Sequence, residues 1–387
     1  MSVVVRRVTT IAVAVAAVAA AALLAGLGLL GAASARADFT PAQEAQMREA
    51  VEQYAPQVGY PGIVAGVWQE GVGEFVATTG VANLRTGAAM GTGGHVRIGS
   101  VTKTMTATLV LQLVQRGRLH LQDSVSEYVD GVPKGRRITI RMLLNHTSGI
   151  HNFTQWLLDR VMRQPHRNWP IQQIVRRALE RPRYCKPGAC WVYSNTNYFL
   201  LGEIVREVTG KRLRDLYERR IWDRLGMGET SFHPRRPTPE PAVHGYVGGK
   251  RGPKDVTDWN FSWAWTAGGA SSTLADLRRW ARALATGEGI LNERMQRKRL
   301  RSVPTTTGDF YGLGILETPP GALGSFYGHD GQTPGYDSLV LYSPSAKVTF
   351  VALGNASTQD DPVTRTPFNP NELDDLAAEL LKILAEG

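Results

Sequence analysis

The sequence predicts an α+β fold, with an antiparallel sheet flanked by helices from both chain ends and a mostly helical second lobe. Runs rich in β-branched and aromatic residues, separated by glycines, lie at 62–83 and return from about 265 onward. The chain between about 118 and 235 instead shows helical periodicity and loops. The hairpin-like spacing of the strand runs favours antiparallel pairing, with the terminal helices on one face of the sheet.

Local signals place the single elements. Helices are predicted where apolar residues recur at helical spacing near capping residues or glycines, at 40–56, 100–117, 194–211 and 371–386. Strands are predicted at 62–69, 73–83, 95–100, 310–316, 325–331, 336–343 and 347–355. These elements predict an α/β lobe made of 38–117 and 236–387, and a helical lobe made of 118–235. A cleft between the two lobes would suit a ligand.

Residues 1–37 form a predicted secretory signal. They begin with two arginines, continue with an apolar run to about Leu30, and end in Ala-Arg-Ala, which predicts cleavage after Ala37. An uncleaved membrane anchor is the alternative, because the apolar run is long enough to span a bilayer. We expect the rest of the chain to be exported to the cell-wall side of the membrane and to be secreted, with no stable anchor after cleavage.

The formal net charge is +10, and arginine-rich stretches lie at 134–141, 176–183 and 211–220. A basic helical face could bind nucleic acid or an anionic wall polymer. Acidic residues are interleaved in the last two stretches, which is typical of a solvent-exposed helix face. Export also argues against nucleic acid, so we expect none as a partner.

The two cysteines, Cys185 and Cys190, lie in "YCKPGACW", where Pro187-Gly188 favours a turn. In an oxidising compartment this spacing predicts a local disulfide. Such a small loop constrains little chain entropy, so we expect local rigidity rather than a large gain in global stability.

The stretch "SVTK", Ser100 to Lys103, is a candidate nucleophile and base. Residues three apart share one helix face, so the amine would lie beside the hydroxyl. A lysine made neutral by burial or by a positive neighbour can take the serine proton. The alternative is an N-cap serine with a surface lysine one turn later, and S-x-x-K by itself favours that alternative.

The stretch "YSNTNY" offers a second pair of candidates. The phenol of Tyr193 could relay a proton, and the amide of Asn195 could bind a substrate amide. The alternative is that Ser194 or Asn195 caps the following helix while Tyr193 lies in the core.

The stretch "YGHDGQTPGY" places His329 next to Asp330. In an extended segment successive side chains point to opposite faces, so this pair would not form a Ser-His-Asp triad. The chain also has no G-x-S-x-G elbow.

Other candidates are weaker. His146 and His151 in "NHTSGIH" lack a third ligand at a recognisable spacing, so no metal site is predicted. Trp259, Trp263 and Trp265 could line a cleft or fill a core, and large aromatic residues favour the core.

Taken together and in this order, the motifs resemble the serine β-lactamase and penicillin-binding superfamily. The similarity extends to "RIGSVTKTMTATLVLQLVQRG", "ITIRMLLNHTSGI", "YSNTNYFLLGEIVREVTG" and "GHDGQTPGY", and so to nearly the whole mature chain. It is strongest to the class C β-lactamase-like branch, which includes secreted actinobacterial serine D-alanyl-D-alanine carboxypeptidases. The resemblance implies a β-lactamase/transpeptidase-like fold.

The resemblance also implies roles for the motif residues. Ser100 would be acylated, Lys103 would be its base, and Tyr193 would pass the proton to the leaving amine. Asn195 would hold the amide side of the substrate. His329 would occupy the first position of the third motif.

Further substrate-binding residues would be Gly331 and Gln332 of the third motif, and Trp265. The backbone N–H groups of Ser100 and Gln332 would form the oxyanion hole.

Two departures from the carboxypeptidase pattern concern the substrate. Asp330 and Gln332 stand where those relatives tend to have hydroxyl residues, and no Lys or Arg lies between Gly312 and His329 to bind a terminal carboxylate.

The function expected from the resemblance is an exported D-alanyl-D-alanine carboxypeptidase that binds β-lactams covalently. An esterase, a D-amino-acid amidase or a β-lactamase on the same scaffold is the alternative. A non-catalytic wall-binding or β-lactam-sensing module is an alternative of another class, against which the intact motifs argue. We expect a monomer that needs no metal or cofactor.

Overall fold

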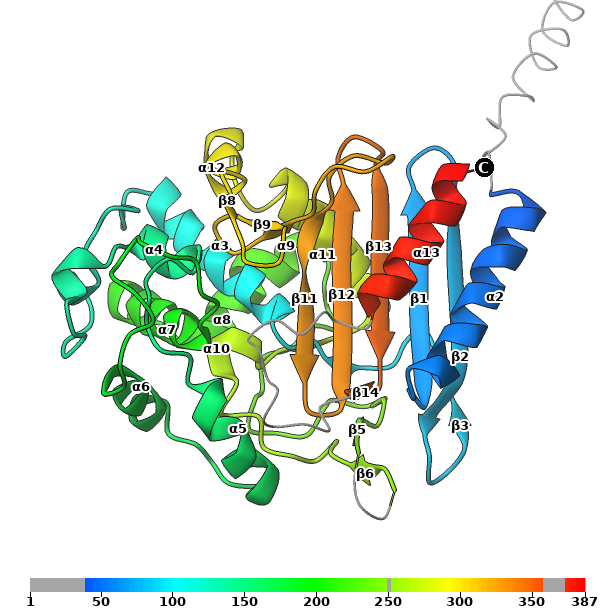
Figure 1. Ribbon diagram of the computed structural model, residues 1–387, viewed down its shortest axis with the longest axis horizontal. Coiled ribbons are helices and arrows are strands. Elements are labelled where there is room, and N and C mark those ends of the chain that lie inside the picture. Colours follow the sequence, from blue (N-terminus) through cyan, green and yellow to red (C-terminus); the bar gives the residue numbers. More distant parts are fainter. Residues whose placement is uncertain (1–38, 249–251, 358–372, 387) are drawn as a thin grey trace, which may run out of the picture.

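The computed structural model describes residues 39–248, 252–357 and 373–386. Its centre is a nine-stranded sheet in the order β3-β2-β1-β13-β12-β11-β10-β9-β8, and neighbouring strands run antiparallel (Figure 1). The strands of this sheet are β1 (Gly62–Gln69), β2 (Gly73–Asn83), β3 (Ala88–Ala89), β8 (Val303–Pro304), β9 (Phe310–Tyr311), β10 (Leu316–Glu317), β11 (Tyr327–Thr333), β12 (Tyr336–Ser343) and β13 (Val348–Gly354). The predicted α+β class is confirmed.

Two small sheets and the helices complete the described chain. The small sheets hold β4 (Val96–Arg97) with β7 (Ser271–Ser272), and β5 (Tyr246–Val247) with β6 (Lys254–Asp255) and β14 (Ala356–Ser357). The α-helices are α2 (Pro41–Gln57), α3 (Val101–Gln115), α4 (Ile140–Leu144), α5 (Thr154–Arg163), α6 (Ile171–Leu179), α7 (Asn195–Thr209), α8 (Leu213–Tyr217), α9 (Asp223–Leu225), α10 (Trp265–Gly268), α11 (Leu274–Thr286), α12 (Glu293–Arg299) and α13 (Leu373–Glu386).

The predicted hairpin of 62–69 and 73–83 is present as β1 and β2. Ala65 pairs with Ala77 in this hairpin and with Ala352 of β13 on its other side. The side chains of β1, β12 and β13 are buried almost throughout, because helices cover both faces of the sheet. β1 and β13 therefore read in the sequence as nearly continuous apolar runs, whereas β12 also buries Asp337, Ser338 and Ser343.

Helices from the two chain ends cover one face of the sheet, as predicted (Figure 1). α2 begins with a capping box, in which the side chain of Thr40 accepts from the Gln43 N–H and the side chain of Gln43 bonds back to Thr40. Val51 of α2 and Leu376 and Leu380 of α13 are fully buried in one apolar cluster with the sheet. Burial of this cluster holds α2 and α13 against the sheet.

α3 lies on the opposite side of the sheet and is buried around its whole circumference. Every residue from 101 to 113 is buried, including polar and charged ones. The helix packs against β11 and β12 and against α7, α8 and α10. A helix enclosed in this way places whatever side chains it carries in the interior.

Strands were expected to return at about 265, but apart from the two-residue β7 the stretch up to 299 forms α10, α11 and α12. In α11, Leu274, Leu277 and Leu284 repeat at helical spacing and are buried against the sheet. The Thr273 side chain caps its start, and Gly287 ends it with a left-handed backbone. The capping threonine, the leucine repeat and the terminating glycine are all present in the sequence.

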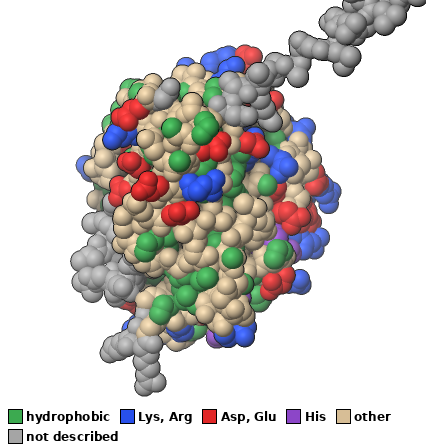
Figure 2. Space-filling model, turned by 90° about the vertical axis from the view of Figure 1, so that its right-hand side faces the viewer, with side chains coloured by type: hydrophobic (Ala, Val, Ile, Leu, Met, Phe, Trp, Pro, Cys, Tyr) green, Lys and Arg blue, Asp and Glu red, His purple; other side chains and the backbone are tan. Residues whose placement is uncertain are grey.

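Charged side chains are intermingled on the face shown in Figure 2, where acidic and basic groups alternate. The net positive charge therefore does not gather into one basic patch on this face. The described helices include none that is both long and apolar enough to cross a bilayer. The predicted signal at 1–37 lies outside the described residues, and the division into two lobes stays a prediction.

We predict that Leu380→Ala lowers the free energy of unfolding by about 2–5 kcal/mol, because it leaves a cavity between α13 and the sheet. Urea unfolding followed by circular dichroism measures this change. Glu379→Ala, at an exposed position of the same helix, is the control and should change stability little. Equal effects of the two substitutions would contradict the packing assigned to α13.

Candidate active site

Ser100 stands at the start of α3, directly after the β4 segment. Its side chain makes no capping hydrogen bond to the helix. Gly99 before it has a φ of +45°, and a Cβ built there would lie 2.7 Å from the backbone nitrogen of Gln332. A side chain at position 99 would therefore separate the Ser100 segment from β11. Ser100 is the N-cap residue of α3, but its side chain does not cap the helix.

Lys103 is fully buried and hydrogen-bonded to Ser100. Its Nζ lies 2.8 Å from Ser100 Oγ and 2.7 Å from the carbonyl oxygen of Ala267 in α10. Burial lowers the pKa of Lys103 well below its ordinary value, and the negative charge of Asp330 opposes this shift only in part. A surface lysine is thus ruled out, and a neutral amine here can accept the serine proton.

Tyr193 is the second group beside the nucleophile. Lys103 Nζ lies 4.8 Å from the centre of the Tyr193 ring, and the Tyr193 and Ser100 side chains share a hydrogen bond. Burial and the charge of Asp330 raise the pKa of Tyr193 well above its ordinary value, despite that hydrogen bond. The phenol therefore keeps its proton and can donate it.

His146 positions the Tyr193 segment, a role that we did not predict. The His146 carbonyl oxygen accepts from the N–H of Val192 at 3.0 Å, and its Nδ1 accepts from the N–H of Ser194 at 3.1 Å. The His146 ring lies 4.3 Å from the Tyr193 ring, centre to centre. Burial, together with the charges of Lys103 and His329, lowers the pKa of His146 well below its ordinary value, so the ring is neutral.

The predicted disulfide between Cys185 and Cys190 is present. Its loop is hydrogen-bonded to the chain around His146, through Gly188 N–H to Thr147 O at 2.8 Å and Tyr184 N–H to Gly149 O at 3.0 Å. The crosslinked loop therefore supports the segment that holds Tyr193. The local rigidity expected from the disulfide therefore acts on the segment next to the candidate site.

Asn195 starts α7 and is partly exposed. Its side-chain Nδ2 donates to Asn152 Oδ1 at 3.2 Å and to Thr154 Oγ1 at 3.4 Å. Ser194 occupies the N-cap position of α7, but its side chain makes no capping hydrogen bond. Asn195 is already the first residue of the helix. Binding of a substrate amide by Asn195 stays a prediction.

The third motif lies on β11, where His329 is buried and Asp330 is partly exposed. The expectation that these two side chains point to opposite faces of the strand stays a prediction. The His329 imidazole contacts the next residue of its own strand, with Nδ1 2.6 Å from the Asp330 carbonyl oxygen and 3.1 Å from the Asp330 carboxylate. Its Nε2 lies 2.9 Å from the hydroxyl of Tyr311. The pair is in contact, yet no triad forms, because both ring nitrogens are engaged away from Ser100.

Asp330 brings a negative charge to the site. Burial raises the pKa of Asp330, but the hydrogen bond from His329 and the charges of His329 and Lys103 outweigh it, so the pKa is lowered. The carboxyl group is therefore ionised at neutral pH. Its side chain is 27% exposed, whereas that of His329 is 1% exposed. Of the two, the carboxylate is thus the group open to a ligand, and substrate contact by His329 stays a prediction.

Gly331 and Gln332 bring β11 close to the nucleophile. A Cβ built on Gly331 would lie 2.1 Å from the carbonyl oxygen of Ile98, so only glycine fits. Ser338 Oγ donates to this same Ile98 oxygen at 3.0 Å, which ties β12 to the chain before Ser100. The backbone of Gln332 thus adjoins the Ser100 segment. An oxyanion hole formed by the N–H groups of these two residues stays a prediction.

The tryptophans divide between core and cavity. Trp259 and Trp263 are buried, as expected. Trp265 begins α10 and lines a cavity whose lining does not include Ser100, Lys103 or Tyr193. Its predicted contact with substrate therefore has no support from the pocket geometry and stays a prediction.

Comparison with known proteins agrees with this geometry. The family model described as Beta-lactamase matches residues 47–369. The chain belongs to the beta-lactamase family. The superfamily predicted from the three motifs is confirmed.

Members of the beta-lactamase family with similar sequences include two penicillin-binding proteins. Penicillin-binding protein 4* of Bacillus subtilis is 27% identical over 293 residues, which cover 71% of this chain and 64% of the relative, less than two thirds of its length. Penicillin-binding protein 4 of Amycolatopsis lactamdurans is 28% identical over 342 residues, covering 81% of this chain and 86% of the relative.

Two solved structures resemble the fold of this family member. The D-stereospecific amidohydrolase of Streptomyces sp. is 29% identical with a TM-score of 0.75, covering 88% of this chain and 97% of the other. The D-amino acid amidase of Ochrobactrum anthropi, 24% identical, has a TM-score of 0.78 and covers 89% of this chain and 99% of the other. The second likeness shows the fold alone.

We predict that His146→Phe slows acylation by a fluorescent penicillin about tenfold or more, because it removes the acceptor of the Ser194 N–H and displaces Tyr193. His146→Asn should restore much of the rate, since its Oδ1 can replace Nδ1 and asparagine tolerates the φ of +62°. Rates are compared well below each melting temperature. Wild-type acylation by the Phe variant, or no recovery in a folded Asn variant, would overturn this role.

Proposed function

We propose that this chain is a serine hydrolase that cleaves an amide or ester of a D-amino acid through an acyl-enzyme at Ser100. The observation that carries the proposal is the hydrogen bond between Ser100 and a fully buried Lys103. A buried amine of lowered pKa next to a serine is the arrangement that activates a hydroxyl nucleophile.

The reaction would run in two halves. Lys103 Nζ takes the proton of Ser100 as its Oγ attacks the substrate carbonyl, and the N–H groups of Ser100 and Gln332 stabilise the oxyanion. The Tyr193 hydroxyl donates a proton to the leaving amine or alcohol and is reprotonated from Lys103. Water then attacks the acyl-enzyme, with the proton transfers reversed, and releases the acid.

Asp330 favours substrates that carry a free ammonium group. Its ionised, partly exposed carboxylate opposes in part the fall in the pKa of Lys103 that burial causes, and so lies within the field of the nucleophile. A carboxylate attracts an ammonium and repels the terminal carboxylate that an exopeptidase must hold. A D-aminoacyl amide or ester, with its free α-ammonium, therefore suits the site better than the C-terminus of a peptide.

The relatives support D-alanyl or other D-aminoacyl substrates. The Streptomyces neighbour is named a D-stereospecific amidohydrolase, and a Staphylococcus aureus relative, 27% identical over 150 residues, is named a teichoic acid D-alanine hydrolase. D-alanyl-D-alanine carboxypeptidase action on peptidoglycan-type peptides, our first expectation, is the second candidate. The penicillin-binding relatives favour it. Export by the segment 1–37 belongs to the same proposal.

We predict that a labelled penicillin attaches to Ser100. Trypsin, which cleaves after Arg97 and Lys103, should release the label on peptide 98–103. Ser100→Ala should take up no label while keeping its fold, because it lacks only the nucleophile. A folded wild-type protein that takes up no label and hydrolyses no D-aminoacyl amide, ester or peptide would disprove the proposed function.

We predict that Asp330→Asn lowers kcat/KM for D-alanine p-nitroanilide about tenfold or more, because a charge-assisted contact with the substrate ammonium is lost. With the N-acetylated anilide, which has no ammonium, the rate should not fall. The ratio of the two rates is the measurement, so that a general effect on Lys103 cancels. Asp223→Asn, at an exposed position of α9, is the charge-matched control. If Asp330→Asn leaves the ratio of the two rates unchanged, carboxypeptidase activity becomes the favoured function.

A further inference from the structure

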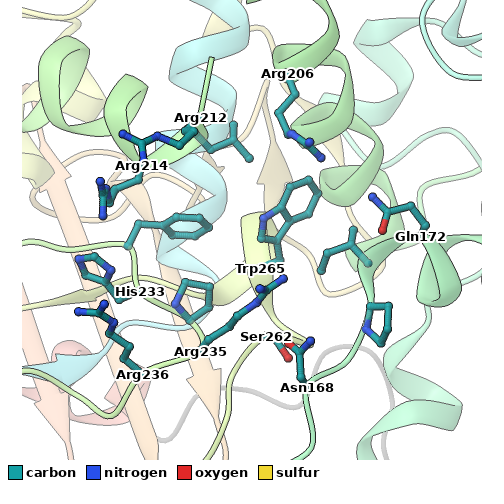
Figure 3. Close-up of a pocket in the computed structure, with 15 residues that line it drawn as sticks. Asn168, Gln172, Arg206, Arg212, Arg214, His233, Arg235, Arg236, Ser262 and Trp265 are labelled. Carbon is teal, nitrogen blue, oxygen red and sulfur yellow. The ribbon is translucent and has the colours of Figure 1, made fainter. Parts of the chain in front are cut away.

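A cavity of about 600 Å³ has a lining that does not include Ser100, Lys103 or Tyr193 (Figure 3). Trp265 and the segment 232–236 form part of its wall, together with residues of α6, α7 and α8. Its basic lining consists of His233 and five arginines, which are Arg206, Arg212, Arg214, Arg235 and Arg236. The lining contains no acidic residue. Its volume is that of an ordinary small-molecule site.

Three of the five arginines are compensated by acids outside the lining. Arg206 pairs with Glu203 at 3.2 Å, and Arg212 pairs with Asp215 at 2.9 Å. Arg214 lies 3.5 Å from that same aspartate and 3.6 Å from Glu218. These pairs leave the cavity close to neutral on the side of α7 and α8.

The other two arginines, Arg235 and Arg236, form no ion pair with any residue of 39–248, 252–357 or 373–386. Both are exposed at the mouth of the cavity. Figure 3 shows the Arg235 side chain extending toward Trp265. The cavity therefore carries an excess of about two positive charges.

The segment that carries these two arginines is held in place. Ser231 and Ser271 exchange backbone hydrogen bonds of 2.9 and 3.0 Å. The buried guanidinium of Arg97 donates to the carbonyl oxygen of Arg236 and lies 4.6 Å from the ring centre of Phe261. Because these hydrogen bonds already fix the backbone of the segment, it loses little conformational entropy when it binds a ligand.

The remaining wall of the cavity is largely apolar. Phe232, Leu213 and Ile171 line it together with Trp265, and Gln172 adds a side-chain amide. Trp265 has a φ of +29°, which is uncommon for a bulky residue and costs backbone energy. The surrounding structure thus holds a large aromatic ring at the cavity in a strained backbone conformation.

We propose that this cavity binds a phosphate ester whose organic part is a flat, apolar body. A phosphomonoester dianion matches the excess positive charge of the cavity, and the guanidinium fork of Arg235, which extends toward Trp265 in Figure 3, can bind phosphate oxygens bidentately. Trp265 and Phe232 offer aromatic surface to the organic part. A carboxylate monoanion would leave one arginine unmatched. This inference does not rest on the proposed hydrolase reaction.

His233 fits this assignment as a further donor. Burial and the charges of Arg214 and Arg236 lower the pKa of His233, with a smaller opposing effect from Glu218. An anion in the cavity would favour the protonated ring and so add one more N–H toward the ligand.

The test is calorimetric titration of the full chain, as the Ser100→Ala variant so that no turnover occurs, with three probes at low salt. Phenyl phosphate should bind saturably at one site, more tightly than inorganic phosphate, which lacks the ring, and than benzoate, which carries one charge. Inorganic phosphate should compete with it. If benzoate binds as tightly as phenyl phosphate, or if no probe binds saturably, the proposal is wrong.

Paired variants locate the site. Arg235→Gln combined with Arg236→Gln should weaken phenyl phosphate binding about tenfold or more, through loss of charge-assisted hydrogen bonds. Arg294→Gln combined with Arg297→Gln makes the same charge change at exposed positions of α12 and should leave binding within about twofold. Circular dichroism confirms that both variants fold. Equal weakening in the two would show only a response to net charge and would overturn the assignment.

Discussion

The burial of Lys103 is the constraint on which the candidate site depends. An ammonium group in a dry interior is strongly disfavoured, so the group must lose its proton or find partners there. In this chain the amine is held between Ser100 Oγ and the carbonyl oxygen of Ala267, both within 2.8 Å. The same burial that would destabilise a charged lysine makes a neutral base available at neutral pH.

This burial requires the surrounding architecture. α3 must be enclosed on every side, which needs the sheet on one flank and α7, α8 and α10 on the other. α10 supplies the carbonyl oxygen that fixes the amine, and α7 begins two residues after Tyr193. Glycines at 99 and 331 then allow the start of α3 and β11 to approach within backbone contact. The same helices and strands therefore form the apolar core and position the catalytic residues.

Charge distinguishes the candidate active site from the arginine-lined cavity. Asp330 places a carboxylate near the nucleophile, where it adds to the rise that burial causes in the pKa of Tyr193 and opposes the fall in the pKa of Lys103. The cavity is lined by arginines, and its lining contains no acid. The two sites are nevertheless physically linked, because α10 begins with Trp265 at the cavity and reaches Ala267 at Lys103. The short helix α10 thus connects the arginine-lined cavity to Lys103.

The sequence by itself determined the fold class, the hairpin of β1 and β2, the helix after Ser100 and the disulfide. Each of these depends on residues that are close in the chain: a repeat of apolar residues, a glycine turn, or two cysteines across Pro187-Gly188. The order of the motifs was also sufficient for the family. α11 was missed although its Thr273 cap and its repeat of leucines are present in the sequence.

Only the tertiary structure decided the state of the site. Whether Lys103 lies at the surface or in the core depends on Ala267, a residue 164 positions away. The place of His146 beside Tyr193 depends on hydrogen bonds to residues 192 and 194, for which its own neighbours give no sign. His329 is held between Asp330, its neighbour in the chain, and the hydroxyl of Tyr311, which lies on another strand. Burial and hydrogen-bond partners arise from segments far apart in the chain, and these two factors set the protonation states.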